Sequence, residues 1–191
     1  IAYLLEIKAC EYENILAVTF TNKAANEMKK RVGILLGNKS FNSYTSPIFW
    51  LGTFHAICLK ILKKHSMEAR LDPNFLIYDT DEQLDVVKSI LKKMDLSDKK
   101  LSPKGILSNI SNAKNELLTP KEYEKYAQGF LQEIVSKIYY EYQKKLTENN
   151  ALDFDDLIMK TVELFEDNPQ ILESFQTLFK YILIDEYQDT N

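Results

Sequence analysis

Residues 181–191 read YILIDEYQDTN, and no other segment of the chain constrains its architecture as strongly. The run from Tyr181 to Ile184 is continuously apolar, as in a strand that is covered on both faces of a parallel sheet. Asp185 and Glu186 follow at once, so this strand, expected at residues 181–185, should present carboxylates at its carboxyl end. Open α/β sheets bind ligands beyond that end of their strands. The segment therefore predicts an α/β fold with a ligand site at Asp185 and Glu186.

The acidic pair is typical of magnesium-dependent nucleotide chemistry. An apolar strand that ends in Asp and Glu is the Walker B arrangement of nucleotide hydrolases. Mg²⁺ is usually bound by few carboxylates together with waters and phosphate oxygens, and attack on a γ-phosphate needs a group that orients the water. Adjacent strand residues point to opposite sides, so one carboxylate can face the metal and the other the water. For a strand that ends only in Asp-Glu, a polar turn is the alternative interpretation.

Two more apolar runs, at residues 15–20 and 48–53, predict further buried strands. Apolar residues recur at helical spacing after each run, first beyond Thr21, an expected helix N-cap, and then from Phe54 onward. A strand followed by a helix, found twice, is typical of βαβ construction. These segments extend the predicted parallel sheet.

Residues 73–150 show almost no strand signal, and their pattern predicts an all-helical insertion. Helix starts are marked by capping boxes at residues 80–83 and 119–122, and by Ser102 before a proline. The second box is expected to open one long helix that reaches Tyr142. The chain would thus consist of a first core part, residues 1–72, the insertion, residues 73–150, and a second core part, residues 151–191.

Composition narrows the class of protein. The 191 residues are 45% hydrophobic and 27% charged, which permits a buried core and excludes a disordered tail. No apolar run approaches the roughly 18–20 residues of a membrane span, so no membrane partner is expected. The two cysteines, Cys10 and Cys58, have no CxxC spacing, which argues against a disulfide scaffold or zinc site and fits a cytoplasmic protein.

The net charge of −4 conceals an uneven distribution. Residues 22–64 carry eight basic side chains against one acidic side chain, whereas residues 148–191 carry eleven acidic side chains against two lysines. This asymmetry indicates a surface that faces a polyanion beside a surface that binds cations. Ordinary solvated helix faces are the alternative interpretation.

Four short motifs follow one another in order: TFTNKAA at residues 19–25, TFHA at 53–56, DFDDL at 153–157 and DEYQDTN at 185–191. Together with ISNAKNELL at residues 110–118, they resemble the N-terminal motor domain of superfamily 1 DNA helicases of the UvrD/PcrA/Rep type. In that family, TFTNKAA is motif Ia and TFHA is motif Ib, usually written TFHS. DFDDL is a segment just before the core resumes, and DEYQDTN is motif II. The resemblance spans essentially the whole chain and implies a partial RecA-like P-loop NTPase sheet with a helical insertion, called 1B.

The resemblance also implies roles at the matching positions. Asp185 would hold Mg²⁺ through its water shell, Glu186 would polarise the hydrolytic water, and Gln188 would link the nucleotide to neighbouring motor residues. The implied cofactors are ATP and Mg²⁺, and the implied partners are ATP with single-stranded and duplex DNA. The residues implied to contact DNA are Phe20 and Phe154, by stacking on bases, and Thr19, Asn22, Thr53 and His55, along the backbone.

Each of these assignments has a structural alternative. Phe20 and Phe154 could pack in the core, and His55 could be a structural histidine. The aspartates at positions 153, 155 and 156 could pass for a metal cluster, although capping of a helix beside the core is favoured. Tyr139, Tyr140 and Tyr142 are expected to pack along their helix rather than to stack on bases.

No GxxxxGK[ST] sequence occurs in the chain, so the loop that cradles the β- and γ-phosphates is not part of it. The adenine-reading motif, the later motor motifs and the phosphate-stabilising arginines of the family are also not found. We therefore expect a fragment of an ATP-dependent 3′-to-5′ DNA helicase acting in repair or replication, inactive by itself. Two alternatives stay open: a DNA-binding module, and the helicase subunit of a helicase–nuclease recombination complex.

Overall fold

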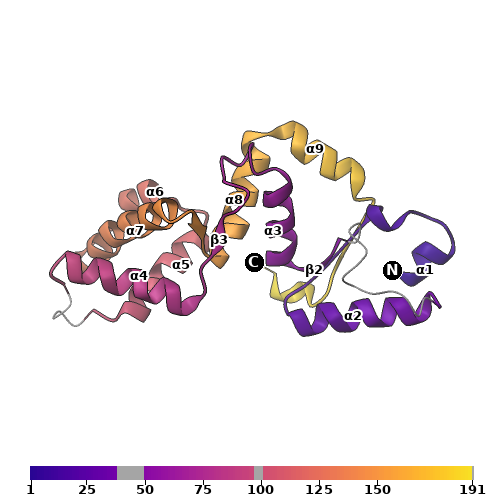
Figure 1. Cartoon of the computed structure of the whole chain (residues 1–191), viewed down its shortest axis with the longest axis horizontal. Helices are drawn as coiled ribbons and strands as arrows, with labels where there is room; N and C mark the ends of the chain where they lie inside the picture. Colours follow the sequence, from indigo (N-terminus) through magenta and orange to yellow (C-terminus); the bar gives the residue numbers. More distant parts are fainter. Residues whose placement is uncertain (38–49, 97–100, 191) are drawn as a thin grey trace. The chain divides into compact units, whose positions relative to one another are not determined.

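The computed structural model describes residues 1–37, 50–96 and 101–190 (Figure 1). The chain forms two compact units. One, here called the sheet unit, comprises residues 1–64 and 163–191, and the other, here called the helical unit, comprises residues 65–162. The domain limits placed at residues 72 and 150 from the sequence stay a prediction.

The sheet unit contains three parallel strands, β1 (Ile15–Thr19), β2 (Trp50–Thr53) and β5 (Tyr181–Ile184), in the order β2-β1-β5. They fall on the three apolar runs, so the α/β fold with a parallel sheet is confirmed. Residues 48 and 49, which the sequence also assigned to the second strand, lie outside the described residues. Ala17 and Thr19 of the central strand are fully inaccessible to solvent.

Helices cover both faces of this sheet. One face, with Ala17 and Leu51, packs on Ala25 of α2 (Asn22–Leu35). On the other side, Trp50 meets Phe175 of α9 (Pro169–Leu178) and the following Phe179 edge-on, with ring centroids 5.6 and 5.3 Å away. α3 (Phe54–Lys64) follows β2 directly and lies across the sheet from α2 (Figure 1). The remaining elements of this unit are α1 (Ala2–Glu6) and two 3₁₀ turns, η1 (Tyr12–Asn14) and η2 (Tyr187–Asp189).

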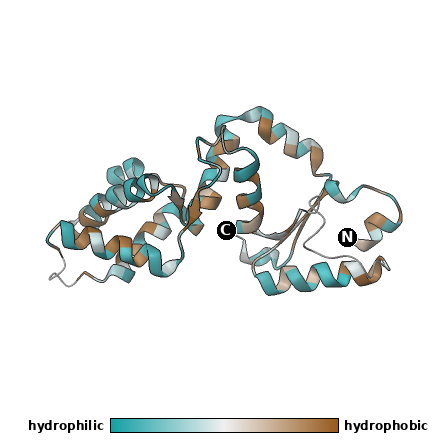
Figure 2. Ribbon diagram, in the orientation of Figure 1, coloured by the Kyte–Doolittle hydropathy of each residue, from teal (hydrophilic) through white to brown (hydrophobic). Residues whose placement is uncertain are grey.

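The helical unit is built from α4 (Thr80–Lys93), α5 (Pro103–Asn115), α6 (Pro120–Tyr126) and α7 (Phe130–Glu148). Its core is formed by the inner faces of α4, α5 and α7, and α6 is mostly hydrophilic with no buried residue (Figure 2). Two short strands, β3 (Leu76–Ile77) and β4 (Ala151–Leu152), pair in parallel within this unit. α8 (Phe154–Asp167) begins here, directly after β4 and Asp153.

Two helix boundaries in this unit differ from the sequence prediction. The single long helix expected from residue 119 to Tyr142 is wrong, because α6 ends at Tyr126 and α7 begins after Gly129. Gly129 adopts a φ of 96°, which L side chains rarely adopt, so its glycine permits a break there. The capping box expected at residues 80–83 lies one residue earlier, where Asp79 accepts from the N–H of Glu82 and Glu82 accepts from Asp79. Thr119 and Thr21 cap α6 and α2 as expected.

Among the helices of the described ranges, none is both long enough and apolar enough to cross a membrane.

Candidate functional site

The candidate residues of the sheet unit meet at the carboxyl edge of the sheet. Thr19 pairs with Thr53 across β1 and β2, and Val18 pairs with Ile184 across β1 and β5. Asp185, the next residue, therefore lies level with Thr19, and its N–H donates to the Val18 carbonyl at 3.0 Å. Because neighbouring strands are about 5 Å apart and the strand order is β2-β1-β5, the carboxyl edge of the sheet places the acidic segment beside Thr19, whereas Thr53 lies on the far side of β1.

The acidic pair leaves the sheet on a tight turn. Asp185 and Glu186 are both exposed, and the Gln188 side-chain amide donates a hydrogen bond to the Glu186 carboxylate. Glu186 has left-handed backbone angles, φ 54° and ψ 47°, which turn the chain into η2. The two carboxylates therefore project from the end of a fixed strand into solvent-accessible space.

A hollow of about 490 Å³ adjoins Asp185 within the sheet unit. Its walls are Leu183 and Ile184 of β5, the first two residues of the chain and one side of α2. Arg31 on that side forms an ion pair with Glu27 at 2.8 Å, and both side chains are largely exposed. Within the described residues, neither Asp185 nor Glu186 forms an ion pair with a lysine, so both carboxylates are available to a ligand.

The residues at this edge suit Mg²⁺ better than a metal that needs a protein cage. Among the described residues, no group of three or more His, Cys, Asp and Glu side chains could hold a metal ion. Mg²⁺ keeps several of its waters and is commonly bound by one or two carboxylates plus substrate phosphates. Asp185, with Glu186 beside it, supplies such a minimal set of oxygen ligands.

Phe20 follows β1 and presents an aromatic face at the same edge. It is 42% exposed, and its ring lies 5.3 Å from that of Phe54, tilted by 53°. Phe54, the first residue of α3 and part of the TFHA motif, packs against the Phe20 ring. Asn22, the first residue of α2, is also exposed.

The side chains of Thr19 and Thr53, at the carboxyl ends of β1 and β2, already form hydrogen bonds within the protein. Thr19 is fully buried, and its hydroxyl donates to the Thr21 carbonyl at 3.0 Å. The Thr53 hydroxyl accepts from the Ala56 N–H at 3.3 Å in the first turn of α3. Contact of either hydroxyl with a phosphate requires that internal bond to be shared or given up. His55 is half-buried, and the DNA-contacting roles of all three residues stay predictions.

Phe154 belongs to the helical unit and is the first residue of α8. It is 45% exposed although Leu152 and Asp153 before it, and Asp156 and Leu157 after it, are buried. The structure thus shows an exposed aromatic ring on a firmly packed helix start, and its contact with DNA stays a prediction.

The whole chain, residues 1–191, matches the family described as UvrD/REP helicase N-terminal domain. The chain belongs to this family. The resemblance drawn from the motifs is thereby confirmed, and the parallel sheet with its helical unit agrees with a partial RecA-like helicase domain.

Bacterial members of the UvrD/REP family are similar to the chain along its full length. A protein named ATP-dependent DNA helicase PcrA from Bacillus subtilis (strain 168) is 49% identical over all 191 residues. Proteins of the same name from Staphylococcus epidermidis and Staphylococcus aureus are 46% and 45% identical over the same length. The chain spans about a quarter of the length of these relatives, covering 25% of each.

A buried ion cluster in the helical unit escaped the sequence interpretation. The Lys114 ammonium of α5 lies 2.7 Å from Asp153 Oδ2 and 2.8 Å from Asp156 Oδ1, and these three side chains are at most 2% exposed. The Tyr142 hydroxyl donates to Asp153 at 2.9 Å, and the Gln143 amide donates to Asp156. The expected capping role of Asp153 and Asp156 agrees with this geometry, but Lys114 was not singled out.

Burial and charge shift the protonation equilibria in this cluster. Burial raises the pKa of the Asp156 carboxyl above its ordinary value of 3.8, and the charge of Lys114 opposes that shift only in part. Burial acts to lower the pKa of Lys114, but the charges of Asp156 and Asp153 outweigh it and raise the pKa above 10.5. The ammonium is therefore held in its charged form at neutral pH.

Part of the positive charge of residues 22–64 serves packing. The Lys60 ammonium lies 4.0 Å from the centre of the Trp50 ring, and that of Lys64 lies 5.5 Å from the Phe175 ring. The pKa of Lys60 is lowered, first by burial and then by the charge of Lys64. Such cation–π contacts stabilise the protein. Not every basic side chain in residues 22–64 is therefore available to a DNA-binding surface.

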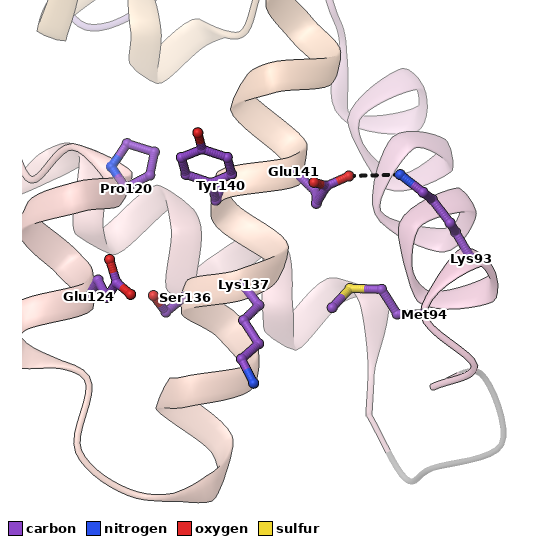
Figure 3. A pocket seen from close by; sticks show the side chains of 8 residues that line it. All are labelled: Lys93, Met94, Pro120, Glu124, Ser136, Lys137, Tyr140 and Glu141. Carbon is purple, nitrogen blue, oxygen red and sulfur yellow. Dashed lines mark hydrogen bonds and ion pairs between the residues drawn. The ribbon is translucent and has the colours of Figure 1, made fainter.

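A second hollow, of about 510 Å³, lies on the helical unit between α6, α7 and the end of α4 (Figure 3). Lys93 and Glu141 form an ion pair of 2.9 Å at its rim. Its lining mixes both signs of charge with Met94, Pro120 and Tyr140, and none of the predicted site residues is among them. No single ligand chemistry follows from such a lining, and we assign the hollow no role.

Proposed function

We propose that the protein carrying this chain is an ATP-dependent DNA helicase in which the sheet unit joins nucleotide hydrolysis to movement along single-stranded DNA. The observation that carries this proposal is the arrangement of residues at the carboxyl edge of the sheet. There Asp185, suited to a magnesium nucleotide, lies level with Thr19, and the exposed ring of Phe20 follows at once. A displacement of the turn at Asp185 and Glu186 would be transmitted to Phe20 through β1, the strand that pairs with β5.

Each residue of the acidic turn has a distinct task in this proposal. Asp185 would hold Mg²⁺ through coordinated water, Glu186 would orient the attacking water and accept its proton, and Gln188 would hold the Glu186 carboxylate in place. Mg²⁺ supplies charge neutralisation on the phosphate oxygens. ATP itself requires a phosphate-binding loop, a sequence that the 191 residues do not include.

The DNA would be bound without reading its sequence. Phe20, supported by Phe54, offers a platform for one base, and Phe154 offers a second platform on the helical unit. Asn22 and the N–H groups at the starts of α2 and α3 are suited to backbone phosphates. We further propose 3′-to-5′ polarity, a role in repair or replication, and the cytoplasm as the place of action, since each accompanies the family resemblance and a DNA substrate.

The test is enzymatic and uses the full-length gene product. We expect ATP hydrolysis that is stimulated by single-stranded DNA, and strand separation on a duplex with a 3′ tail but not with a 5′ tail. The 191-residue chain alone is expected to do neither. Binding of DNA without ATP turnover by the full-length product would contradict the helicase and leave a binding module. Nuclease activity in the same product would favour a helicase–nuclease subunit.

A single substitution tests the stacking platform. Phe20→Ala in the full-length product should weaken binding of oligo(dT) by about 5- to 150-fold, because base–aromatic stacking contributes about 1–3 kcal/mol. The dependence of the dissociation constant on salt should be unchanged, because no charge is removed. Tyr126→Ala, which removes a more exposed aromatic residue on α6 without a proposed role, is the control. Equal effects of the two substitutions in a fluorescence-anisotropy titration would remove Phe20 from the DNA site.

A further inference from the structure

The ion cluster of Lys114, Asp153 and Asp156 surrounds the backbone from which Phe154 projects. Asp153 precedes Phe154 directly, and Asp156 follows it by two residues. The Asp156 N–H donates to Asp153 Oδ1 at 2.8 Å, and the Asp153 N–H approaches Asp156 Oδ2 at 3.3 Å. This reciprocal arrangement closes the first turn of α8 around Phe154, and Lys114 connects both carboxylates to α5.

The chain before Phe154 is held as firmly. The Tyr78 N–H donates to the Leu152 carbonyl at 2.8 Å, and the Leu76 N–H donates to the Asn150 carbonyl at 2.8 Å. The β3–β4 ladder therefore fixes the two residues that lead into Asp153. Phe154 thus stands between a paired strand and a locked helix turn, while its own ring remains 45% exposed.

The cluster is more elaborate than helix capping requires. A single solvated Asp, Ser or Thr is sufficient to cap a helix. Here two carboxylates and an ammonium are withdrawn from water, a process whose desolvation penalty can exceed the Coulombic gain. Hydrophobic residues of similar volume often serve stability as well or better, so stability alone does not account for the arrangement. Directional bonds from several elements do, however, define the position of a neighbouring side chain closely.

We propose that Lys114, Asp153 and Asp156 are positioning residues, which hold the Phe154 ring in the orientation that stacks on a base of single-stranded DNA. Tyr142 completes the arrangement by donating to Asp153 from α7. The inference rests on the proposed DNA-contacting role of Phe154 and adds to it the group that sets its geometry. It also explains why the exposed ring of Phe154 lies directly next to a buried ion cluster.

A matched pair of tyrosine substitutions tests this in the full-length gene product. Tyr142→Phe removes the hydrogen bond to Asp153, whereas Tyr139→Phe removes a bond of equal length, 2.9 Å, to the Leu118 carbonyl outside the cluster. Both rings are buried and are retained. Binding is measured with oligo(dT) that carries 2-aminopurine, whose fluorescence reports stacking, and thermal unfolding is recorded in parallel.

We expect Tyr142→Phe to weaken oligo(dT) binding by about 3- to 10-fold and to reduce the stacking signal, a smaller effect than the about 5- to 150-fold of Phe154→Ala. Tyr139→Phe should lower the melting temperature by a similar amount with binding unchanged. In the Tyr142→Phe/Phe154→Ala double variant, the dissociation constant should equal that of Phe154→Ala alone, because both substitutions act through the same ring.

Two results would overturn the inference and can be told apart. If Phe154→Ala weakens binding but the effect of Tyr142→Phe is additive to it, or is matched by Tyr139→Phe, the cluster is only structural and Phe154 keeps its role. If Phe154→Ala leaves binding unchanged, the proposed role of Phe154 is itself wrong. Lys114→Met provides a stronger perturbation of the cluster, and Tyr142→Phe keeps the test valid should that variant fail to fold.

Discussion

Replacing Glu186 by Gln in the full-length gene product is expected to lower DNA-stimulated ATP turnover by about 100- to 10,000-fold, the usual contribution of a general base. Glutamine preserves the size of the side chain and its hydrogen bond with Gln188, but its amide cannot accept a proton from water. ATP binding should persist, because Asp185 and the phosphate-binding loop are untouched. Phosphate release and equilibrium binding of a fluorescent ATP analogue measure the two quantities separately.

Glu173→Gln is the matched control for this substitution. Glu173 is an exposed glutamate on α9 of the same unit, and it takes no part in the acidic turn. Its substitution should leave turnover unchanged. Asp185→Asn should differ from Glu186→Gln by weakening binding of the magnesium nucleotide as well as turnover. Turnover of Glu186→Gln within a few-fold of wild type would show that another group activates the water.

Lys114→Met is expected to lower the free energy of unfolding of the helical unit by about 3–5 kcal/mol, the range for breaking a buried ion pair from one side. Methionine fills similar space, but it leaves the two carboxylates of Asp153 and Asp156 buried without a cation. Lys88→Met is the control, because that lysine pairs with Asp85 at the same 2.8 Å but on the surface. A surface pair contributes about 0–1 kcal/mol. Urea titration followed by circular dichroism measures both losses.

The loss at Lys114 should depend on pH. The pKa of Asp156 is already raised above its ordinary 3.8, first by burial, and removal of the Lys114 charge should raise it further. The folded protein then binds a proton more tightly than the unfolded chain, so its stability falls as pH rises above 3.8 through the folded-state pKa. The deficit of Lys114→Met should accordingly be larger at pH 8 than at pH 5. A deficit independent of pH would mean that lost packing, not charge, is responsible.

The strands and the acidic edge were predictable because their signals are local. Continuous apolarity followed by Asp185 and Glu186 defines a buried strand and its polar end in one short segment. The break at Gly129 was missed because apolar residues keep a helical spacing on both sides of it. The strand β3 was missed because two residues, Leu76 and Ile77, are too few to establish a period.

The local sequence pattern gives only a weak signal for the ion cluster. Lys114 stands four residues after Ile110 on the buried face of α5, which was a usable signal, but a lone lysine in such a register is ordinarily assigned to solvent. Its partners lie 39 and 42 residues further along the chain. Only the packing of α5, α7 and α8 reveals that the lysine has carboxylates to meet.

Under the proposed function, the left-handed backbone at Glu186 sets thermal stability against catalytic turnover. A conformation of this kind disfavours most residues with a Cβ by about 1–2 kcal/mol, a penalty that glycine avoids. Selection for heat resistance alone would therefore enrich glycine at this position and discard the carboxylate with it. When variants of this protein are selected for thermal stability, position 186 should be excluded from mutagenesis, because under the proposed function a gain in melting temperature there would cost ATP turnover.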